Sequence, residues 1–292
     1  MDVSVCIATY RRPQGLARLL ASLGRMKLPA DAQVEVIVVD NDPDAEETLA
    51  LPPAGALSVR RVREPRRNIA RARNRAVAIA RGAWLAFVDD DEEVHEGWLA
   101  AFLAQAERRQ CDGLFGPVVP RAQEPERGGL EWLAFFERGR FAGGARVPLA
   151  SACTHNAFVR RRLFDDAAFE PEFGRSGGED TQLFGLLLAR GADFRWCDEA
   201  RVDEWLPAER LRPAWLLRRA FRAGSALGRI RRRRPAWPAA LPHALAALAS
   251  ALVLLPPAAA MGRAHRLRSA MRVCGAAGRV FGLLGGRYEE YK

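Results

Sequence analysis

The chain has 292 residues, 49% of them hydrophobic and 27% charged, a composition that can bury a core in one large domain or two smaller ones and that excludes wholesale disorder. Its net charge of +10 is unevenly distributed, because residues 201–292 contain 18 of the 45 Lys and Arg but only 5 of the 35 Asp and Glu. This distribution differs from that of a nucleic-acid-binding protein that is basic throughout. The five cysteines lack C-x-x-C spacing, which argues against a disulfide framework and a structural zinc site and favours a reducing compartment.

Strand and helix patterns alternate over the first 120 residues. Short apolar runs predict strands, and apolar residues at helical spacing predict the helices between them, the first of which begins at Pro13. Because the N-terminus enters a strand at once, we expect no cleaved secretory signal. This alternation favours an α/β fold with a mainly parallel sheet, whose ligands bind at the carboxyl ends of the strands. The predicted strands are 3–8, 34–39, 58–62, 83–88, 114–119 and, further on, 194–197, and the later helices are 68–81 and 98–109.

The middle of the chain is less regular. Residues 121–178 are rich in Gly, Arg and aromatic residues, and a loop over 174–180 leads into a predicted apolar helix over 183–188. This loop ends in Glu179 and Asp180. A carboxylate at such a junction could act as a general base that deprotonates an acceptor hydroxyl. The alternative is that both acids only favour the start of the helix through its dipole.

The C-terminal region combines basic and apolar segments. A basic amphipathic helix is predicted over 212–230, followed by Arg231–Arg234. Residues 235–262 carry no Asp, Glu, Lys or Arg, contain one histidine, His243, and are interrupted by five prolines. This segment is long enough to span a bilayer, but its prolines and flanking cations favour a shallow or re-entrant element on an anionic membrane surface. The alternative is a helical hairpin packed on the rest of the protein.

Aspartates follow two of the predicted core strands. Asp89, Asp90 and Asp91 end the fourth strand, and Asp40 ends the second. Carboxylates at a strand end can bind Mg²⁺ or Mn²⁺, cations that also take oxygen ligands from substrate phosphates, although a run of aspartates is also typical of a solvated turn. Asp40 could accept a hydrogen bond from the ribose or base of a nucleotide. Neither G-x-G-x-x-G after the first strand nor G-x-x-x-x-G-K-[ST] is present, which disfavours dinucleotide oxidoreductases and P-loop nucleoside triphosphatases.

Several motifs together resemble glycosyltransferase family 2, whose enzymes have the GT-A fold. Their order and spacing cover about residues 1–190. Two later segments, at 200–224 and 286–291, are similar to bacterial exopolysaccharide glucosyltransferases of the succinoglycan type. The motifs that carry the family resemblance are VSVCIATYRRP at 3–13, VEVIVVDND at 34–42, NIARARNRA at 68–76, WLAFVDDDEEVHEGWL at 84–99 and GGEDTQL at 177–183.

The resemblance implies a metal-dependent, inverting transfer of a hexose, glucose in the narrower group, from a nucleotide-sugar that is most often UDP-linked. The narrower group implies that the acceptor is a hydroxyl of a lipid-linked oligosaccharide in exopolysaccharide or cell-envelope polysaccharide synthesis. By the resemblance, Asp180 is the catalytic base, with Glu179 beside it. The nucleotide-sugar-binding positions of the family map to Thr9, Tyr10, Arg11, Asp40, Arg73, Asp89 and Asp90.

The expected metal is Mg²⁺ or Mn²⁺, held by Asp89 and Asp91 of the family's Asp-x-Asp motif. Many members have a further His ligand late in the fold. Here the matching region contains Glu204 instead, so either this residue takes the role or the site lacks it. A lone His155 lies in the region that often contacts the acceptor, but a single histidine is more typical of a structural role.

Two other functions stay open from the residues alone. A nucleotidyltransferase acting on sugar phosphates also binds a nucleotide through strand-end aspartates, and a nucleic-acid- or lipid-binding protein would use the basic tail. We expect no nucleic acid partner, because the tail contains no recognisable nucleic-acid-binding module. We predict a GT-A domain over 1–210 and a basic helical region over 211–292 that binds anionic lipid on the cytoplasmic face of the inner membrane.

Overall fold

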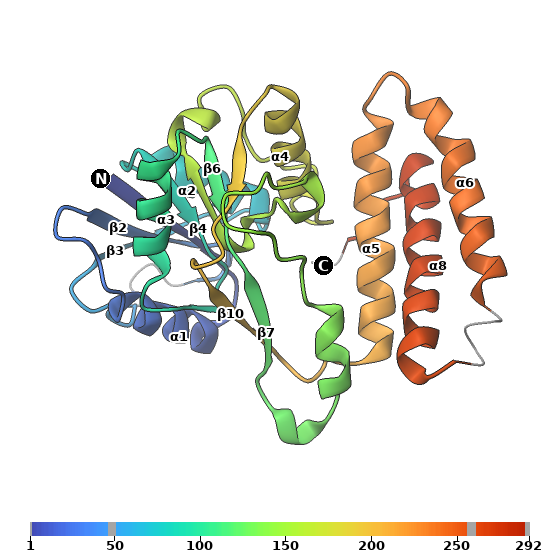
Figure 1. Ribbon diagram of the computed structural model, residues 1–292, viewed down its shortest axis with the longest axis horizontal. Coiled ribbons are helices and arrows are strands. Elements are labelled where there is room, and N and C mark those ends of the chain that lie inside the picture. The colour runs from blue at the N-terminus through green and yellow to red at the C-terminus, as the bar shows by residue number, and fades with distance from the viewer. Residues whose placement is uncertain (1, 46–50, 256–260, 290–292) are drawn as a thin grey trace. The chain divides into compact units, whose positions relative to one another are not determined.

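The computed structural model describes residues 2–45, 51–255 and 261–289 (Figure 1). Its strands are β1 (Asp2–Thr9), β2 (Gln33–Asp40), β3 (Ser58–Arg63), β4 (Trp84–Phe87), β5 (Glu92–Val94), β6 (Gly113–Phe115), β7 (Val118–Ala122), β8 (Ala157–Arg160), β9 (Phe194–Trp196) and β10 (Val202–Leu206). Its α-helices are α1 (Pro13–Gly24), α2 (Ile69–Ile79), α3 (Trp98–Arg108), α4 (Glu179–Ala189), α5 (Pro213–Arg232), α6 (Trp237–Val253) and α8 (Arg263–Leu283). Short 3-10 helices cover Pro125–Arg127, Leu130–Phe135, Leu149–Ser151, Thr154–Asn156 and Arg161–Phe164.

The central sheet is mainly parallel, as expected. Its strand order is β3-β2-β1-β4-β8-β6-β9, and a smaller sheet has the order β5-β10-β7. The pairs β1–β2, β1–β4, β2–β3 and β6–β9 are parallel, whereas β8 is antiparallel to β4 and β6. Because β2 and β4 flank β1, the residues that follow all three strands meet at one edge of the sheet. Asp40 lies opposite Thr9 in the β1–β2 register, and Asp89 follows β4 on the other side of β1.

Hydrophobic residues cover both faces of this sheet. Along β1, Val3, Val5 and Ile7 pack into one buried cluster with residues of α1 and α3, while Cys6 and Ala8 pack with residues of α2 and α4. Alternate residues of a strand point to opposite faces, so a strand covered on both sides is apolar along its whole length. The inner strands β1, β2 and β4 are accordingly rich in buried apolar residues, whereas the edge strand β3 contains three arginines.

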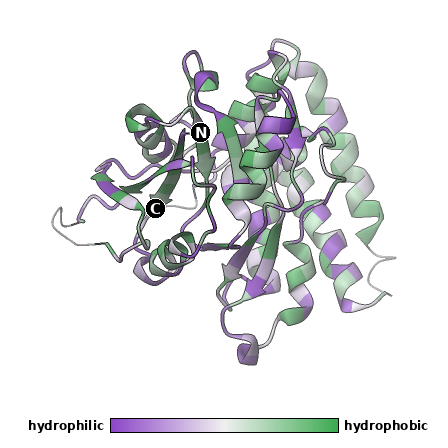
Figure 2. Ribbon diagram, turned by 60° about the vertical axis from the view of Figure 1, so that its left-hand side comes forward, coloured by the Kyte–Doolittle hydropathy of each residue, from purple (hydrophilic) through white to green (hydrophobic). Residues whose placement is uncertain are grey.

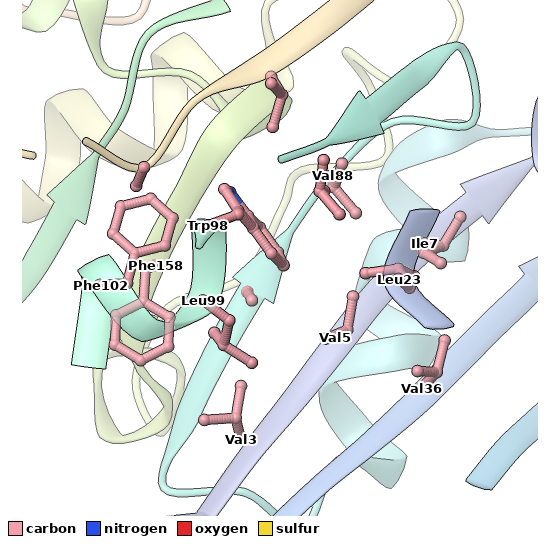
Figure 3. Packing of buried hydrophobic residues seen from close by; sticks show 14 of the residues in the cluster. Val3, Val5, Ile7, Leu23, Val36, Val88, Trp98, Leu99, Phe102 and Phe158 are labelled. Atoms are coloured by element: carbon pink, nitrogen blue, oxygen red, sulfur yellow. The ribbon is translucent and has the colours of Figure 1, made fainter. Parts of the chain in front are cut away.

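An aromatic stack fixes the position of β4. The ring of Phe158 lies between those of Trp84 and Phe102, with centroid distances of 4.6 and 5.2 Å. Trp98 packs edge-on against Phe102, and Figure 3 shows Trp98, Phe102 and Phe158 side by side. The indole N–H of Trp98 donates a hydrogen bond to Asn156 Oδ1 at 2.8 Å. Each aromatic pair contributes about 0.5–1.5 kcal/mol beyond its buried area. The stack therefore holds α3 and β8 against β4, the strand that ends in the aspartates.

The structure corrects the expected strand over 114–119, which is two strands in different sheets. They are separated at Gly116 and Pro117. A Cβ on Gly116 would lie 2.1 Å from the carbonyl oxygen of Ala200, so the backbones approach too closely there for any side chain. Pro117 lacks the N–H that a continuing ladder would need. Sequence periodicity also missed β5, β8 and β10, which are only three to five residues long.

The described residues form two compact units. The first contains residues up to 121, 137–174 and 179–205, and the second contains 122–136, 175–178 and the residues from 206 onward. The boundary predicted at residue 210 differs from this arrangement. Two short segments from the middle of the chain, 122–136 and 175–178, belong to the same unit as the C-terminal helices.

The second unit contains α5, α6 and α8. The predicted basic helix corresponds to α5, and the predicted uncharged segment begins with α6. Residues 256–260 of that segment, and residues 290 and 291 of the C-terminal motif, lie outside the described residues. None of the helices in the described ranges has both the length and the apolar content needed to cross a bilayer.

Candidate active site

The loop after β1 is bonded to the aspartates after β4. Thr9 Oγ1 donates a hydrogen bond to Asp90 Oδ2 at 2.8 Å. Arg12 Nη1 lies 2.9 Å from both Asp90 Oδ1 and Asp91 Oδ2, so one guanidinium joins two neighbouring carboxylates. Charge-assisted bonds of this kind are roughly twice as strong as neutral ones. Thr9, Asp90 and Asp91 were predicted site residues, whereas Arg12 was not.

Arg11, which was a predicted site residue, points elsewhere. Its guanidinium bonds Asp42 and Asp44 at 2.8 and 2.7 Å at the protein surface. Arg11 has a φ of 51°, in the left-handed region that non-glycine residues rarely adopt. This turn directs the two adjacent arginines to different sides, so that Arg12 but not Arg11 reaches the aspartates that follow β4.

Asp40 lies opposite Thr9 in the β1–β2 register. Its Oδ2 accepts a hydrogen bond from Arg61 at 2.5 Å, and its Oδ1 accepts one from the backbone N–H of Asp42 at 3.0 Å. Near the same strand end, the guanidinium of Arg67 lies 4.2 Å from the ring centroid of Tyr10. A carboxylate and an aromatic ring are groups that can bind a ribose or base by hydrogen bonding and stacking.

Arg73 links the aspartates to the acidic pair at the start of α4. This buried side chain lies one turn into α2, whose first turn is capped by the Asn68 side chain, and it donates to Asp89 Oδ1 at 3.0 Å and to Glu179. Burial lowers the pKa of Arg73, but Asp89 and Glu179 more than reverse this effect, so the guanidinium stays charged. The structure thus brings together three predicted site residues that are far apart in the sequence.

The two acids at 179 and 180 have different environments. Glu179 is buried, which raises its pKa to about 7, although Arg73 opposes this rise. Asp180 is half-buried, and its Oδ1 accepts a hydrogen bond from the backbone N–H of Thr181 at 2.6 Å. The helix begins at Glu179 rather than at residue 183, so both acids lie in its first turn, where the helix dipole favours negative charge.

Glu92, which was not predicted, and His155, for which a structural role was favoured, both join the site. His155 Nδ1 lies 3.1 Å from Asp89 Oδ2 and 3.7 Å from Glu92 Oε1, and Glu92 Oε2 accepts a hydrogen bond from the Asp89 N–H at 2.8 Å. Burial lowers the pKa of His155 to about 3 and raises that of Glu92 well above its usual value. Burial would also raise the pKa of Asp89, but His155 and Arg73 more than offset this and lower it to about 2. For Glu92 the sequence signal was its position directly after the three aspartates, and for His155 it was its place in the region that often contacts the acceptor.

The three predicted metal ligands do not form one cluster. The described residues contain no group of three or more His, Cys, Asp or Glu side chains placed to hold a metal ion. Glu204 is buried on β10, directly opposite Glu92 in the antiparallel register, while Asp89 and Asp91 are each paired with an arginine. Their oxygen donors suit a hard divalent cation that takes one or two carboxylates and completes its shell with substrate phosphates. The residues therefore fit a cation bound together with substrate rather than one held by the protein alone.

Helix α1 packs directly behind the aspartates, which makes Gly15 sensitive to substitution. A Cβ there would lie 2.4 Å from the backbone oxygen of Asp90. We expect Gly15→Ala to destabilise the fold by about 1–3 kcal/mol through overpacking, although alanine favours helices by about 1 kcal/mol elsewhere. Urea unfolding of the variant and of the wild-type chain measures the difference in their free energies of unfolding. Gly185→Ala in α4 is the control, because its Cβ would approach only Leu149, at 3.4 Å, and equal stability of the two variants would contradict the prediction.

Comparisons with known proteins match this chain to a family and to a curated protein. The family described as Glycosyl transferase family 2 matches residues 4–167. The succinoglycan biosynthesis protein ExoM of Rhizobium meliloti (strain 1021) is 37% identical over 306 residues, covering 98% of this chain and 93% of that protein.

Solved structures share the fold. The mannosyltransferase PcManGT from Pyrobaculum calidifontis, in complex with GDP-Man and Mn²⁺, aligns with a TM-score of 0.63 and 20% identity over 96% of this chain and 86% of that one. S. aureus TarS 1–349, in complex with UDP, aligns with a TM-score of 0.56 and 16% identity over 99% and 93% of the two chains. A longer TarS chain aligns with a TM-score of 0.55 and 17% identity over 80% of this chain, and only 43% of that longer chain is covered.

Proposed function

Since this chain belongs to glycosyltransferase family 2, we propose that it transfers glucose from a UDP-sugar to a hydroxyl of a lipid-linked oligosaccharide. The observation that carries the proposal is the link from Asp89, at the end of β4, through Arg73 to the acidic pair that opens α4. Arg73 thereby connects Asp89, which we assign to the side of the donor diphosphate, to Glu179 and Asp180, which we assign to the side of the acceptor. The similarity to a succinoglycan biosynthesis protein over 98% of the chain supports exopolysaccharide or cell-envelope polysaccharide synthesis.

The nucleotide part of the donor is proposed to bind along the ends of β1 and β2. Tyr10 offers a ring for stacking, Asp40 offers acceptors for a base or ribose, and Thr9 and Arg11 flank them. The structural neighbours solved in complex with GDP-Man and with UDP support a nucleotide as the ligand of this fold. The orientation of Arg11 toward Asp42 and Asp44 places its charge at the exposed side of that edge.

The chemical step that we propose is a single displacement. The carboxylate of Asp180 takes the proton of the acceptor hydroxyl, and the oxygen attacks the anomeric carbon of the donor sugar. The bond between that carbon and the diphosphate oxygen breaks, its electron pair stays on the oxygen, and the nucleoside diphosphate leaves. Attack opposite the leaving group inverts the anomeric configuration. Arg73 holds Glu179 beside Asp180, which keeps the first turn of α4 at the site.

The leaving diphosphate carries negative charge that the site must stabilise. Mg²⁺ or Mn²⁺ held by Asp89 and Asp91, once bound, would supply charge neutralisation at the diphosphate. The guanidinium of Arg12 keeps Asp91 and Asp90 in place, and Arg73 does the same for Asp89. The lowered pKa of Asp89 keeps this carboxylate ionised at neutral pH.

A screen of nucleotide-sugars tests the proposed function. The purified chain is incubated with each donor and Mn²⁺, with and without a membrane extract containing lipid-linked saccharides, and the released nucleotide is identified. We expect UDP from UDP-glucose, with sugar incorporated into lipid. Release of pyrophosphate from a nucleoside triphosphate and a sugar phosphate would instead identify a nucleotidyltransferase, and no product from any UDP-sugar would overturn the proposed donor.

We propose that the C-terminal unit docks on the cytoplasmic face of the inner membrane. Helix α6 is hydrophobic along most of its length (Figure 2). Its buried residues are alanines, whereas the larger Leu245, Leu252 and Val253 are 48%, 49% and 73% exposed. Exposed apolar residues of this size, next to the exposed cations Arg231–Arg234, suit the acyl region and headgroups of an anionic bilayer. An enzyme held there would meet an acceptor that is carried on a lipid.

Serine substitutions on α6 test this docking. We expect Leu245→Ser combined with Leu252→Ser to weaken co-sedimentation with vesicles of phosphatidylglycerol by about tenfold or more. Burying a leucine contributes about 1.5–3 kcal/mol, and half of each of the two side chains is already covered by the protein. Ala246→Ser, at an exposed position of the same helix, is the control. If the wild-type chain stays in the supernatant with these vesicles, the unit does not dock on anionic lipid.

A further inference from the structure

Residues 175–178 form a short segment that belongs to the C-terminal unit, although the residues on both sides of it in the sequence belong to the other unit. From Gly178 the chain passes directly into Glu179, the first residue of α4. The segment therefore ends at Glu179 and Asp180, the second of which takes the acceptor proton in the proposed function.

Helix α5 binds this segment tightly. Arg229, which is 6% exposed, donates a hydrogen bond from Nη1 to the hydroxyl of Ser176, which is 5% exposed. A buried guanidinium needs such partners, because removing a charge from water is costly unless it is hydrogen-bonded. Nearer the surface, Arg175 forms an ion pair with Glu289 at 3.1 Å.

Gly178 contacts the same face of α5. A Cβ on Gly178 would lie 2.8 Å from the Cβ of Ala226, which is three residues before Arg229 and so lies on the same side of the helix. Gly177 and Gly178 have φ angles of 78° and 96°, a conformation that residues with side chains rarely adopt. The path of the chain into α4 thus depends both on these glycines and on the surface of α5.

The upstream end of the segment is also held. The carbonyl of Gly174 accepts a hydrogen bond from the Ile69 N–H at 3.2 Å, at the start of α2, and a Cβ on Gly174 would overlap the side chain of Asn68. A segment of four residues between two held points has little freedom, so a shift at Ser176 must be passed on to Glu179 and Asp180.

We propose that Arg229 is a positioning residue for the catalytic acid pair, which it holds in place through Ser176 without touching the reacting atoms. The proposal rests on the proposed function, because it assumes that Asp180 removes the acceptor proton. It gives the C-terminal helices a role in catalysis that is separate from membrane docking. A displacement of about 1 Å at a reacting group can cost up to 10²-fold in rate.

The test compares Arg229→Ala, Arg229→Lys and Ser176→Ala with the wild-type chain in detergent solution, where membrane docking plays no part. We expect kcat to fall by about tenfold or more in Arg229→Ala and Ser176→Ala, because the acids lose their fixed position. Arg229→Lys keeps a donor and should recover part of the rate. KM for the UDP-sugar should not change, since the residues after β1, β2 and β4 are untouched. The double variant Arg229→Ala with Ser176→Ala should be no slower than the slower single variant.

Hydrogen exchange supplies the readout that does not depend on activity. Amides of residues 175–185 should exchange faster in Arg229→Ala, whereas those of residues 84–94 should not. Arg218→Ala, at an exposed position of the same helix, is the control. If the wild-type chain transfers sugar and both Arg229→Ala and Ser176→Ala keep the kcat of Arg218→Ala, Arg229 has no positioning role. If the wild-type chain transfers no sugar, the proposed function fails instead.

Discussion

Replacing Asp91 with alanine is expected to lower the rate of sugar transfer by about 10³-fold while the chain stays folded. Arg12 loses the Asp91 carboxylate in this variant and keeps its ion pair with Asp90, so the arginine remains anchored in the site. The proposed cation loses one of its two protein ligands. Charge stabilisation by a metal contributes several kcal/mol to a transition state, and each 1.36 kcal/mol is about tenfold in rate. Activity should therefore fall far more than stability.

Calorimetric titration with UDP separates the metal role from a structural one. Mn²⁺ should strengthen UDP binding to the wild-type chain and have no effect on Asp91→Ala. Asp198→Ala is the matched control, because Asp198 is ion-paired with Arg140 in the same unit but belongs to no candidate site. Full activity of Asp91→Ala, or of the wild-type chain in excess chelator, would show that Asp91 holds no catalytic metal.

The variant Asp180→Asn is expected to lower turnover by about 10²-fold or more without changing the affinity for the UDP-sugar. An amide oxygen can still accept the hydrogen bond from the Thr181 N–H, so the first turn of α4 keeps its geometry. The amide cannot take a proton at neutral pH, and loss of a general base typically costs about 10²–10⁴-fold. Donor binding depends on residues from other strands and should persist.

Kinetics and product analysis check this prediction. The measurements are kcat, KM for the donor and the anomeric configuration of the product by NMR. Glu179→Gln is the comparison, because Glu179 is paired with the buried Arg73 and its substitution should lower stability more than Asp180→Asn does. Normal turnover by Asp180→Asn, or a product that retains the donor configuration, would rule out Asp180 as the base of an inverting reaction.

Most elements of the sheet and its covering helices could be predicted from the sequence, because their signals are local. Apolar runs marked β1, β2 and β4, and helical spacing marked α1, α2 and α3. The aspartates after β4 stood out for the same reason, since a run of acids directly after a buried strand needs no knowledge of distant residues. The family resemblance rested on these local motifs in their order, and the family match over residues 4–167 confirms it.

Other features depend on pairing between distant segments and could not be predicted. Three short strands, β5, β8 and β10, have too few residues for a period to be visible and exist because partners pair with them. The expected strand over 114–119 divided because Gly116 must approach another backbone closely, which no local pattern reveals. In the C-terminal region the sequence indicated an apolar segment but not which face of α6 would be exposed.

By itself, then, the sequence determined the α/β architecture, the family and the acidic residues at the strand ends, because propensity, periodicity and motif order are properties of neighbouring residues. Only the tertiary structure decided which cations meet these acids. Arg12 rather than Arg11 binds Asp90 and Asp91, since one left-handed residue turns the chain. Arg73 bridges Asp89 and Glu179 across 16 and 106 residues of sequence, and Arg229 reaches Ser176 across 53. Such pairings follow from how the helices pack, because a buried charge is stable only where the fold brings it a partner.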